Sequence, residues 1–161
     1  MSGNLAGEIQ QSKAFSSLEE EAFLNLARTH EFLQHRISEF FKQFQLTATQ
    51  YNILRILRGA GDDGISCSQA AERMVTADPD ITRLLDRLET RGLISRERSR
   101  DDRRVVMSRI TPQGLDLLKT IDKPLTGFNK QSLGHLGHER LTQLIESLES
   151  IRQSAASSVV E

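Results

Sequence analysis

The chain has 161 residues, of which 37% are hydrophobic and 27% charged, and its formal net charge is −1. That length is sufficient to bury a hydrophobic core without disulfide or metal staples. No apolar run approaches the roughly 18–20 residues that span a bilayer, and residues 1–17 do not resemble a secretory signal. The single cysteine, Cys67, excludes an internal disulfide framework, and we expect a cytoplasmic protein.

Positive charge is concentrated in one segment of the chain. Residues 83–109 contain nine arginines, no lysine and five carboxylates, so this segment carries a net charge of +4 while the rest of the chain carries −5. A small basic region on an otherwise acidic protein indicates a local surface for a polyanion rather than general affinity for polyanions.

The first helix is predicted to be long. Residues 1–16 lack hydrophobic periodicity, and we expect a flexible N-terminal arm. Ser17 and Glu20 then form a predicted capping box. The apolar residues that follow recur at near-heptad steps over about residues 18–44. Such a helix extends beyond a small domain, so we expect its apolar stripe to form a subunit interface.

Two shorter helices follow, each with a capping box at its start. Thr47 and Gln50 begin the first, and Ser66 and Gln69 begin the second. The sequence GAGDDG separates them, because glycines and aspartates favour turns.

The next helix has the most regular pattern in the chain. Asp78 is predicted to cap it, with Pro79 in the first turn, where a missing N–H costs nothing. Its apolar residues are spaced i, i+3, i+4 and i+7, which predicts one buried face: Ile81, Leu84, Leu85 and Leu88. Gly92 supplies the left-handed residue that ends the helix.

The period then changes to that of β-structure. Residues 93–99 and 104–110 each predict a strand, and a polar turn around Arg100–Arg103 joins them as a hairpin. Thr111 and Pro112 begin another helix, which we expect Pro124 to kink. A last helix is predicted over about residues 138–153.

This order of elements predicts a mainly α fold with a small β-hairpin. Three helices followed by a hairpin form a winged helix-turn-helix, which places a recognition helix in the DNA major groove. We assign this DNA-binding domain to residues 46–111, and a helical dimerisation region to residues 17–45 and 112–154. Residues 155–161 are a tail.

The outward face of the recognition helix and the hairpin, or wing, are the predicted DNA-binding surfaces. Arginine suits a bidentate bond to guanine, and threonine contacts a base edge or a thymine methyl. The predicted residues on the recognition helix are Pro79, Asp80, Thr82, Arg83, Asp86 and Arg87. Those on the wing are Arg98, Arg100, Asp102, Arg103 and Arg104. Those expected at the DNA backbone are Ser66, Ser68 and Gln69.

The aspartates between the wing arginines need a separate explanation. We expect Asp102 to hold Arg104 or a neighbouring arginine in one extended pose, which lowers the net charge but orders the side chains. The arginines then follow phosphates or enter a narrow, A·T-rich minor groove.

Three alternatives remain open at this stage. The basic hairpin would also suit an acidic protein partner, and the acidic start of the recognition helix favours that interpretation. Cys67 near a helix N-terminus would suit thiol sensing. His30, His35, His135 and His138 would suit a metal site only weakly, because they lack thiolate or carboxylate ligands at ligand spacing, and we expect neither a metal nor a cofactor. No catalytic motif is present, and we do not expect an enzyme.

Three stretches in this order resemble the MarR family of bacterial transcriptional regulators: LTATQYNILRIL, DRLETRGLISR and DDRRVVMSRITPQG. The resemblance covers about residues 20–152. It implies an obligate homodimer with interlocked first and last helices, which presents two recognition helices and two wings to a pseudo-palindromic operator. It also implies a regulator, most often a repressor, that a small aromatic or phenolic anion releases from DNA.

The resemblance extends to individual positions. Asp102 and Arg104 match the family's D-x-R pattern in the wing, and Thr82, Arg83 and Arg87 match the exposed face of its recognition helix. The sequence departs from the family at residues 78–80, DPD, where small hydroxyl residues are more usual. Carboxylates at that end of the helix would repel phosphates, so the bases that this helix reads are left open.

Overall fold

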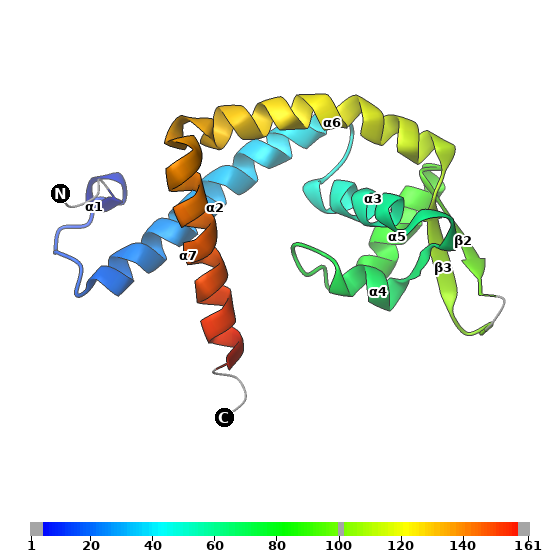
Figure 1. Ribbon diagram of the computed structural model, residues 1–161, viewed down its shortest axis with the longest axis horizontal. Coiled ribbons are helices and arrows are strands. Elements are labelled where there is room, and N and C mark those ends of the chain that lie inside the picture. Colours follow the sequence, from blue (N-terminus) through cyan, green and yellow to red (C-terminus); the bar gives the residue numbers. More distant parts are fainter. Residues whose placement is uncertain (1–4, 100–101, 158–161) are drawn as a thin grey trace.

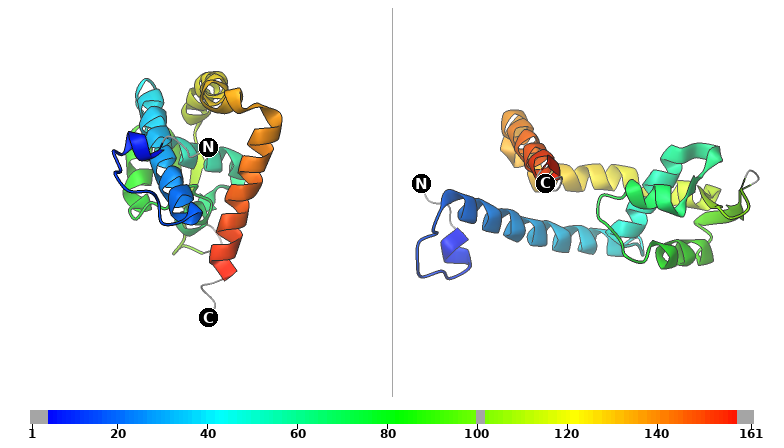
Figure 2. Two further views of the ribbon diagram at one scale, coloured as in Figure 1. Left: turned by 90° about the vertical axis from the view of Figure 1, so that its left-hand side faces the viewer. Right: turned by 90° about the horizontal axis from the view of Figure 1, so that it is seen from below.

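Two long helices, α2 (Leu18–Lys42) and α6 (Pro112–Leu133), connect the two ends of the molecule (Figure 1). The computed structural model describes residues 5–99 and 102–157, without the side chains of residues 155–157. At one end of the long helices lies a cluster of shorter elements from α3 to β3. At the other end lie α1 (Leu5–Glu8) and α7 (Gly137–Ser157), and α7 projects away from the cluster (Figure 2).

The helix-turn-helix begins where the capping patterns predict. Helix α3 (Ala48–Ala60) follows Thr47, and α4 (Cys67–Glu72) follows Ser66. In both capping boxes the hydroxyl accepts from the backbone N–H three residues later, and the glutamine side chain accepts from the N–H of the capping residue. Both predictions are therefore confirmed.

The start of the recognition helix differs from the prediction. Helix α5 (Ile81–Thr90) is capped by Asp80, not Asp78, and Pro79 precedes the helix instead of occupying its first turn. The carboxylate of Asp78 accepts from the N–H of Asp80 at 2.9 Å and so shapes the turn before the helix. The cap-plus-proline pattern misled because Asp80 is an equally good cap, closer to the apolar stripe. At the other end Gly92 has φ 70°, as predicted for the residue that ends this helix.

The hairpin belongs to a sheet of three strands. Strands β2 (Ile94–Arg98) and β3 (Val106–Ile110) pair in antiparallel register as predicted, with Arg96 opposite Ser108. A two-residue strand, β1 (Ile65–Ser66), pairs with the other edge of β3 and was not predicted. Two residues give too short a pattern to detect in the sequence. This strand anchors the base of the wing to the start of α4.

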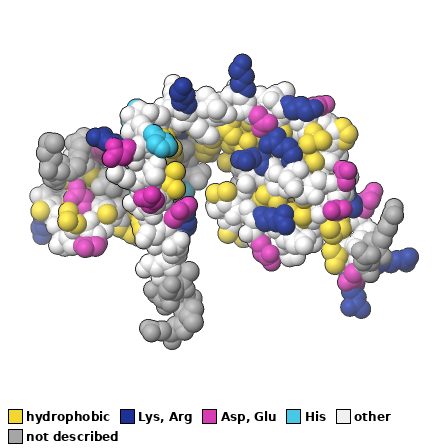
Figure 3. Space-filling model, viewed as in Figure 1, with side chains coloured by type: hydrophobic (Ala, Val, Ile, Leu, Met, Phe, Trp, Pro, Cys, Tyr) yellow, Lys and Arg dark blue, Asp and Glu magenta, His cyan; other side chains and the backbone are white. Residues whose placement is uncertain are grey.

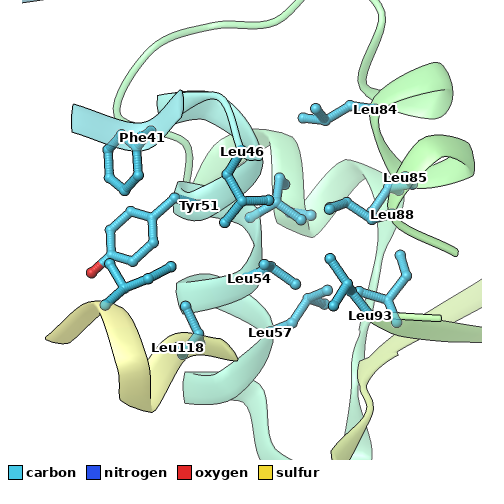
Figure 4. Close-up of a cluster of buried hydrophobic side chains, with 14 of the residues drawn as sticks. Phe41, Leu46, Tyr51, Leu54, Leu57, Leu84, Leu85, Leu88, Leu93 and Leu118 are labelled. Atoms are coloured by element: carbon cyan, nitrogen blue, oxygen red, sulfur yellow. The ribbon is translucent and has the colours of Figure 1, made fainter. Parts of the chain in front are cut away.

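One hydrophobic core holds the winged part together (Figure 4). Leu54 and Leu57 of α3 meet Leu85 and Leu88 of α5, and all four are almost fully buried. Leu118 of α6 closes this core from the other side. Burying a leucine side chain contributes about 1.5–3 kcal/mol, so these contacts fix the orientation of α5 relative to α3.

The long helices extend beyond this core. Helix α2 begins at Ser17, which accepts from the N–H of Glu20. The carboxylate of Glu20 accepts from Ser16 instead of Ser17, so the predicted reciprocal box is only half correct. Helix α6 begins after Thr111 with Pro112 in its first turn, and it continues through Pro124 without interruption.

The last helix is longer than predicted and has few neighbours. A 3₁₀ turn at Gly134–Leu136 (η2) leads directly into α7. No residue of α7 among those described is buried. None of the described helices combines the length and hydropathy that a membrane crossing requires.

The N-terminal arm is partly ordered. Residues 5–8 form one helical turn (α1), and Leu5 is buried. Glu8 lies 3.9 Å from Arg28 of α2. The prediction of an arm without structure is therefore wrong for this turn, because polar composition hid the one apolar residue that anchors it.

Candidate nucleic-acid interface

Helix α5 has one buried face and one polar face. Leu84, Leu85 and Leu88 are buried, as the spacing predicts, whereas Ile81 is only partly buried against the same core. The residues that the sequence assigns to the outward face are all exposed, namely Thr82, Arg83, Asp86 and Arg87. The leucines therefore pack the helix against the core, and a row of polar side chains faces solvent, where a ligand could bind.

Asp80 and Arg83 interact across the first turn of α5. One carboxylate oxygen of Asp80 accepts from the backbone N–H of Arg83 at 3.3 Å. The other lies 3.1 Å from Nε of the Arg83 guanidinium. Both oxygens of this carboxylate therefore face Arg83.

Arg96 links α5 to the wing, and it is not among the predicted site residues. From β2, its Nε donates to Glu89 at 2.8 Å, and its Nη2 lies 2.7 Å from Glu89 and also donates to Asp86. Hydrogen bonding to Glu89 is the main cause that raises the pKa of Arg96 above its ordinary value. The carboxylate of Asp86, which the sequence predicts as a DNA contact, therefore pairs with an arginine of the same chain.

The end of the wing carries arginines of a different kind. Arg98, Arg103 and Arg104 are exposed and make no ion pair within the described residues, while Arg100 lies outside them. Lys and Arg side chains project at the lower right of Figure 3, beside the grey residues of this hairpin. Positive charge at this tip is left for an external partner.

Asp102 does not hold an arginine guanidinium in the described structure. Its carboxylate accepts from the backbone N–H of Arg104 at 2.9 Å, and its carbonyl accepts from the N–H of Val105 at 2.9 Å. Asp102 therefore contacts the backbone of Arg104 and not its guanidinium, which differs from the prediction. The short Asp side chain bonds to the backbone two residues later, as is usual in turns, so it shapes the turn and not the arginine.

The start of α4 carries the residues that we expect at the DNA backbone. Ser66 and Gln69 form the capping box, and the hydroxyls of Ser66 and Ser68 lie 3.0 Å apart. Ser66 and Ser68 border a cavity of about 470 Å³ between α4, α5 and the wing, which Cys67 and Arg104 also line. Among the described residues, no three His, Cys, Asp or Glu side chains group as metal ligands.

A larger cavity lies between α3 and the two long helices. Its volume is about 650 Å³, and it is lined by α2, α3, α6 and the segment that follows α4. Tyr51 and Phe41 stack in its wall with ring centroids 4.7 Å apart. Burial raises the pKa of Tyr51 above its ordinary value. Arg55 lies 6.0 Å over the Tyr51 ring, and His30 is on the opposite helix.

The described lining of this cavity contains Arg55 and His30 but no carboxylate. Aromatic walls beside an exposed arginine suit a small aromatic or phenolic anion. The cavity lies beside Tyr51, His30 and α2.

The arrangement of α3, α4, α5 and the wing defines a winged helix-turn-helix protein. The family model described as "MarR family" matches residues 46–106. The chain is 44% identical in sequence to a MarR transcription factor from Planctomyces limnophilus. The crystal structure of that protein matches with a TM-score of 0.67, and the match covers 84% of this chain and 98% of that one. The chain belongs to the MarR family, and it is a DNA-binding transcriptional regulator of that type.

Two more distant relatives also match the chain, one in sequence and one in structure. The HTH-type transcriptional regulator MhqR of Bacillus subtilis is 26% identical over 133 residues, which cover 83% of this chain and 90% of MhqR. The structure of the S. aureus MepR–DNA complex has a TM-score of 0.72 at 22% identity, covering 83% of this chain and 96% of that one.

Proposed function

We propose that two copies of the chain bind a pseudo-palindromic operator and repress transcription until a small anion releases them. The observation that carries the proposal is the mounting of α5, whose leucines are buried while Thr82, Arg83 and Arg87 face outward. A helix held in this way enters a major groove and reads base edges. Its site of action is the cytoplasmic nucleoid, and we assign it no catalytic step.

The described contacts support a division of labour on the DNA. Thr82, Arg83 and Arg87 read bases, while Pro79 lies at the same end of the helix. The wing arginines Arg98, Arg100, Arg103 and Arg104 bind phosphates or the minor groove. Ser66, Ser68 and Gln69 contact the backbone beside the start of α4. Asp86 and Asp102 act indirectly, since one holds Arg96 and the other shapes the wing turn.

The helices outside the winged part supply the dimer interface in this proposal. Phe23 and Phe32 of α2 and Ile145 and Ile151 of α7 have more than half of their surface exposed. Large apolar side chains gathered on helices without a partner mark an association surface. A second copy of the chain is the occupant we assign, through residues 17–45 and 112–154 of each copy.

The cavity between α3 and the two long helices is the effector site that we propose. It is lined on one side by α2 and α6 and on the other by α3 and residues 74–76, which lead toward the recognition helix. Asn52 of α3 accepts from the N–H of Val75 at 2.9 Å. An anion beside Arg55 that displaces this segment would shift α5 relative to its partner copy and weaken binding to paired half-sites.

Electrophoretic mobility shift with the duplex flanking its own gene tests the DNA-binding proposal. We expect a complex that a scrambled duplex of equal length does not compete away, and a dimer mass by light scattering. A stable monomer, or equal competition by the scrambled duplex, would overturn the proposal. Aromatic acids test the effector site. We expect them to abolish the complex of the wild-type protein but not that of Arg55→Ala.

A further inference from the structure

Two carboxylates, those of Asp78 and Asp80, precede helix α5, and Asp80 is among the residues assigned to DNA. A helix N-terminus with free N–H groups normally attracts a phosphate. Here Asp80 fills that position with a negative charge of its own. The carboxylate repels the phosphates of any duplex, whatever its sequence. We therefore expect Asp80 to make another contribution to DNA binding.

The contacts of Asp80 indicate that this contribution is made through Arg83. One oxygen accepts from the backbone N–H of Arg83, and the other lies 3.1 Å from Nε of the same residue. A guanidinium has five N–H donors, one on Nε and four on the two terminal nitrogens. Engagement of Nε therefore leaves the terminal pair available for the O6 and N7 acceptors of guanine.

The arginine is well placed for such a role. Three-quarters of the Arg83 side chain is exposed, whereas half of the Asp80 side chain is. Asp80 is fixed by its capping bond, so it holds the mobile partner and not the reverse. Without it, an exposed arginine would sample many rotamers and meet phosphates as readily as bases.

We infer that Asp80 is a specificity-determining positioning residue, which aims Arg83 at a base and keeps the start of α5 from acting as a phosphate site. The inference rests on the proposed DNA-binding function of α5. Exposed ion pairs contribute about 0–1 kcal/mol to stability, so removing this pair leaves the fold intact. The effect is confined to how the protein discriminates between duplexes.

The test compares Asp80→Asn and Asp80→Ser with the wild-type dimer. Asparagine and serine retain the helix cap, but neither carries the charge that holds the guanidinium. Each protein is used to select duplexes from a random library, and its affinity for the best duplex and for a scrambled one is measured across salt concentrations. Asp63→Asn is the matched control, since it removes an exposed carboxylate from the turn between α3 and β1, outside the surfaces assigned to DNA and to the dimer interface.

We expect both Asp80 variants to bind the scrambled duplex several-fold more tightly and to lose about tenfold in the specific-to-scrambled ratio. Base preference should weaken at one position of each half-site and persist at the others. In Arg83→Ala, adding Asp80→Asn should no longer lower the ratio, because the side chain it aims is absent.

Two results would overturn the inference. One is a specific-to-scrambled affinity ratio that stays unchanged in both Asp80 variants while the wild type is selective. The other is that Asp80→Asn lowers this ratio by the same factor in the wild type and in Arg83→Ala. If the wild-type protein selects no duplex at all, the proposed function itself fails, so the two failures are distinguishable.

Discussion

The recognition helix and the wing both carry arginines, but the two regions hold them in opposite ways. Around α5, Arg83 lies against Asp80, and Arg96 bridges Asp86 and Glu89. At the wing, Arg103 and Arg104 make no ion pair within the described residues. Arginines at the start of α5 and along the strands are therefore ordered by carboxylates, whereas those at the tip of the wing are exposed without an ion pair among the described residues.

This difference separates selectivity from attraction. An arginine fixed before binding loses little conformational entropy when it meets a base, and its fork matches only some base edges. An exposed, mobile arginine attracts phosphates at any sequence and is sensitive to salt. The comparison predicts that changes near α5 alter which duplex is bound, whereas changes at the wing alter how strongly every duplex is bound.

The largest effect is expected at the link between the two regions. Arg96→Ala leaves Asp86 and Glu89 as two unpaired neighbouring carboxylates that are partly solvated, so it should destabilise the fold by about 1 kcal/mol. It should also lower specific affinity more than tenfold, because the wing loses its fixed angle to α5. Thermal unfolding and duplex binding measure the two effects.

Arg109→Ala is the control for that prediction. Arg109 also joins the sheet to a carboxylate, Glu97, at 3.5 Å, but it does not contact α5. It should affect unfolding more than duplex selectivity. An equal loss of selectivity in both variants would contradict a special role for the link to α5.

The next effect sharpens the comparison on the helix itself. Arg83→Ala should cost about 1–3 kcal/mol in binding to the preferred duplex, with a much smaller loss on scrambled duplexes. Competition assays with the two duplexes measure this difference. If affinity for both fell by the same factor, Arg83 would be a phosphate contact and the contrast with the wing would disappear.

A smaller and uniform effect is expected at the wing. Arg104→Ala should weaken binding several-fold on every duplex and reduce the slope of log affinity against log salt by about one. Lys123→Ala, on the exposed surface of α6, is the matched loss of one positive charge. A change in base preference in Arg104→Ala would show that the wing also reads sequence.

The smallest effect is expected at the cavity between the two regions. Cys67 lines it, yet the mounting of α5 does not depend on the thiol. Cys67→Ser should leave duplex affinity unchanged, both before and after mild oxidation. Oxidant-induced release that disappears in this variant would instead support thiol sensing.

Most of the local structure was predictable, because caps, apolar spacing and strand alternation depend on residues close in sequence. The hydroxyl and glutamine of each capping box in α3 and α4 lie three residues apart, and both boxes form as predicted. Where two candidates competed locally, as Asp78 and Asp80 did for the cap of α5, the pattern alone chose the wrong one.

The sequence by itself determined the order of the longer helices and of the two wing strands, the buried face of α5 and the basic character of residues 83–109. Only the tertiary structure decided which arginines are held and which are exposed. Arg96 meets Asp86 and Glu89 because the sheet packs beside α5, at a distance along the chain that no periodicity encodes. Pairing of charges depends on side chains that folding brings together, whereas helix and strand formation depends mainly on neighbouring residues.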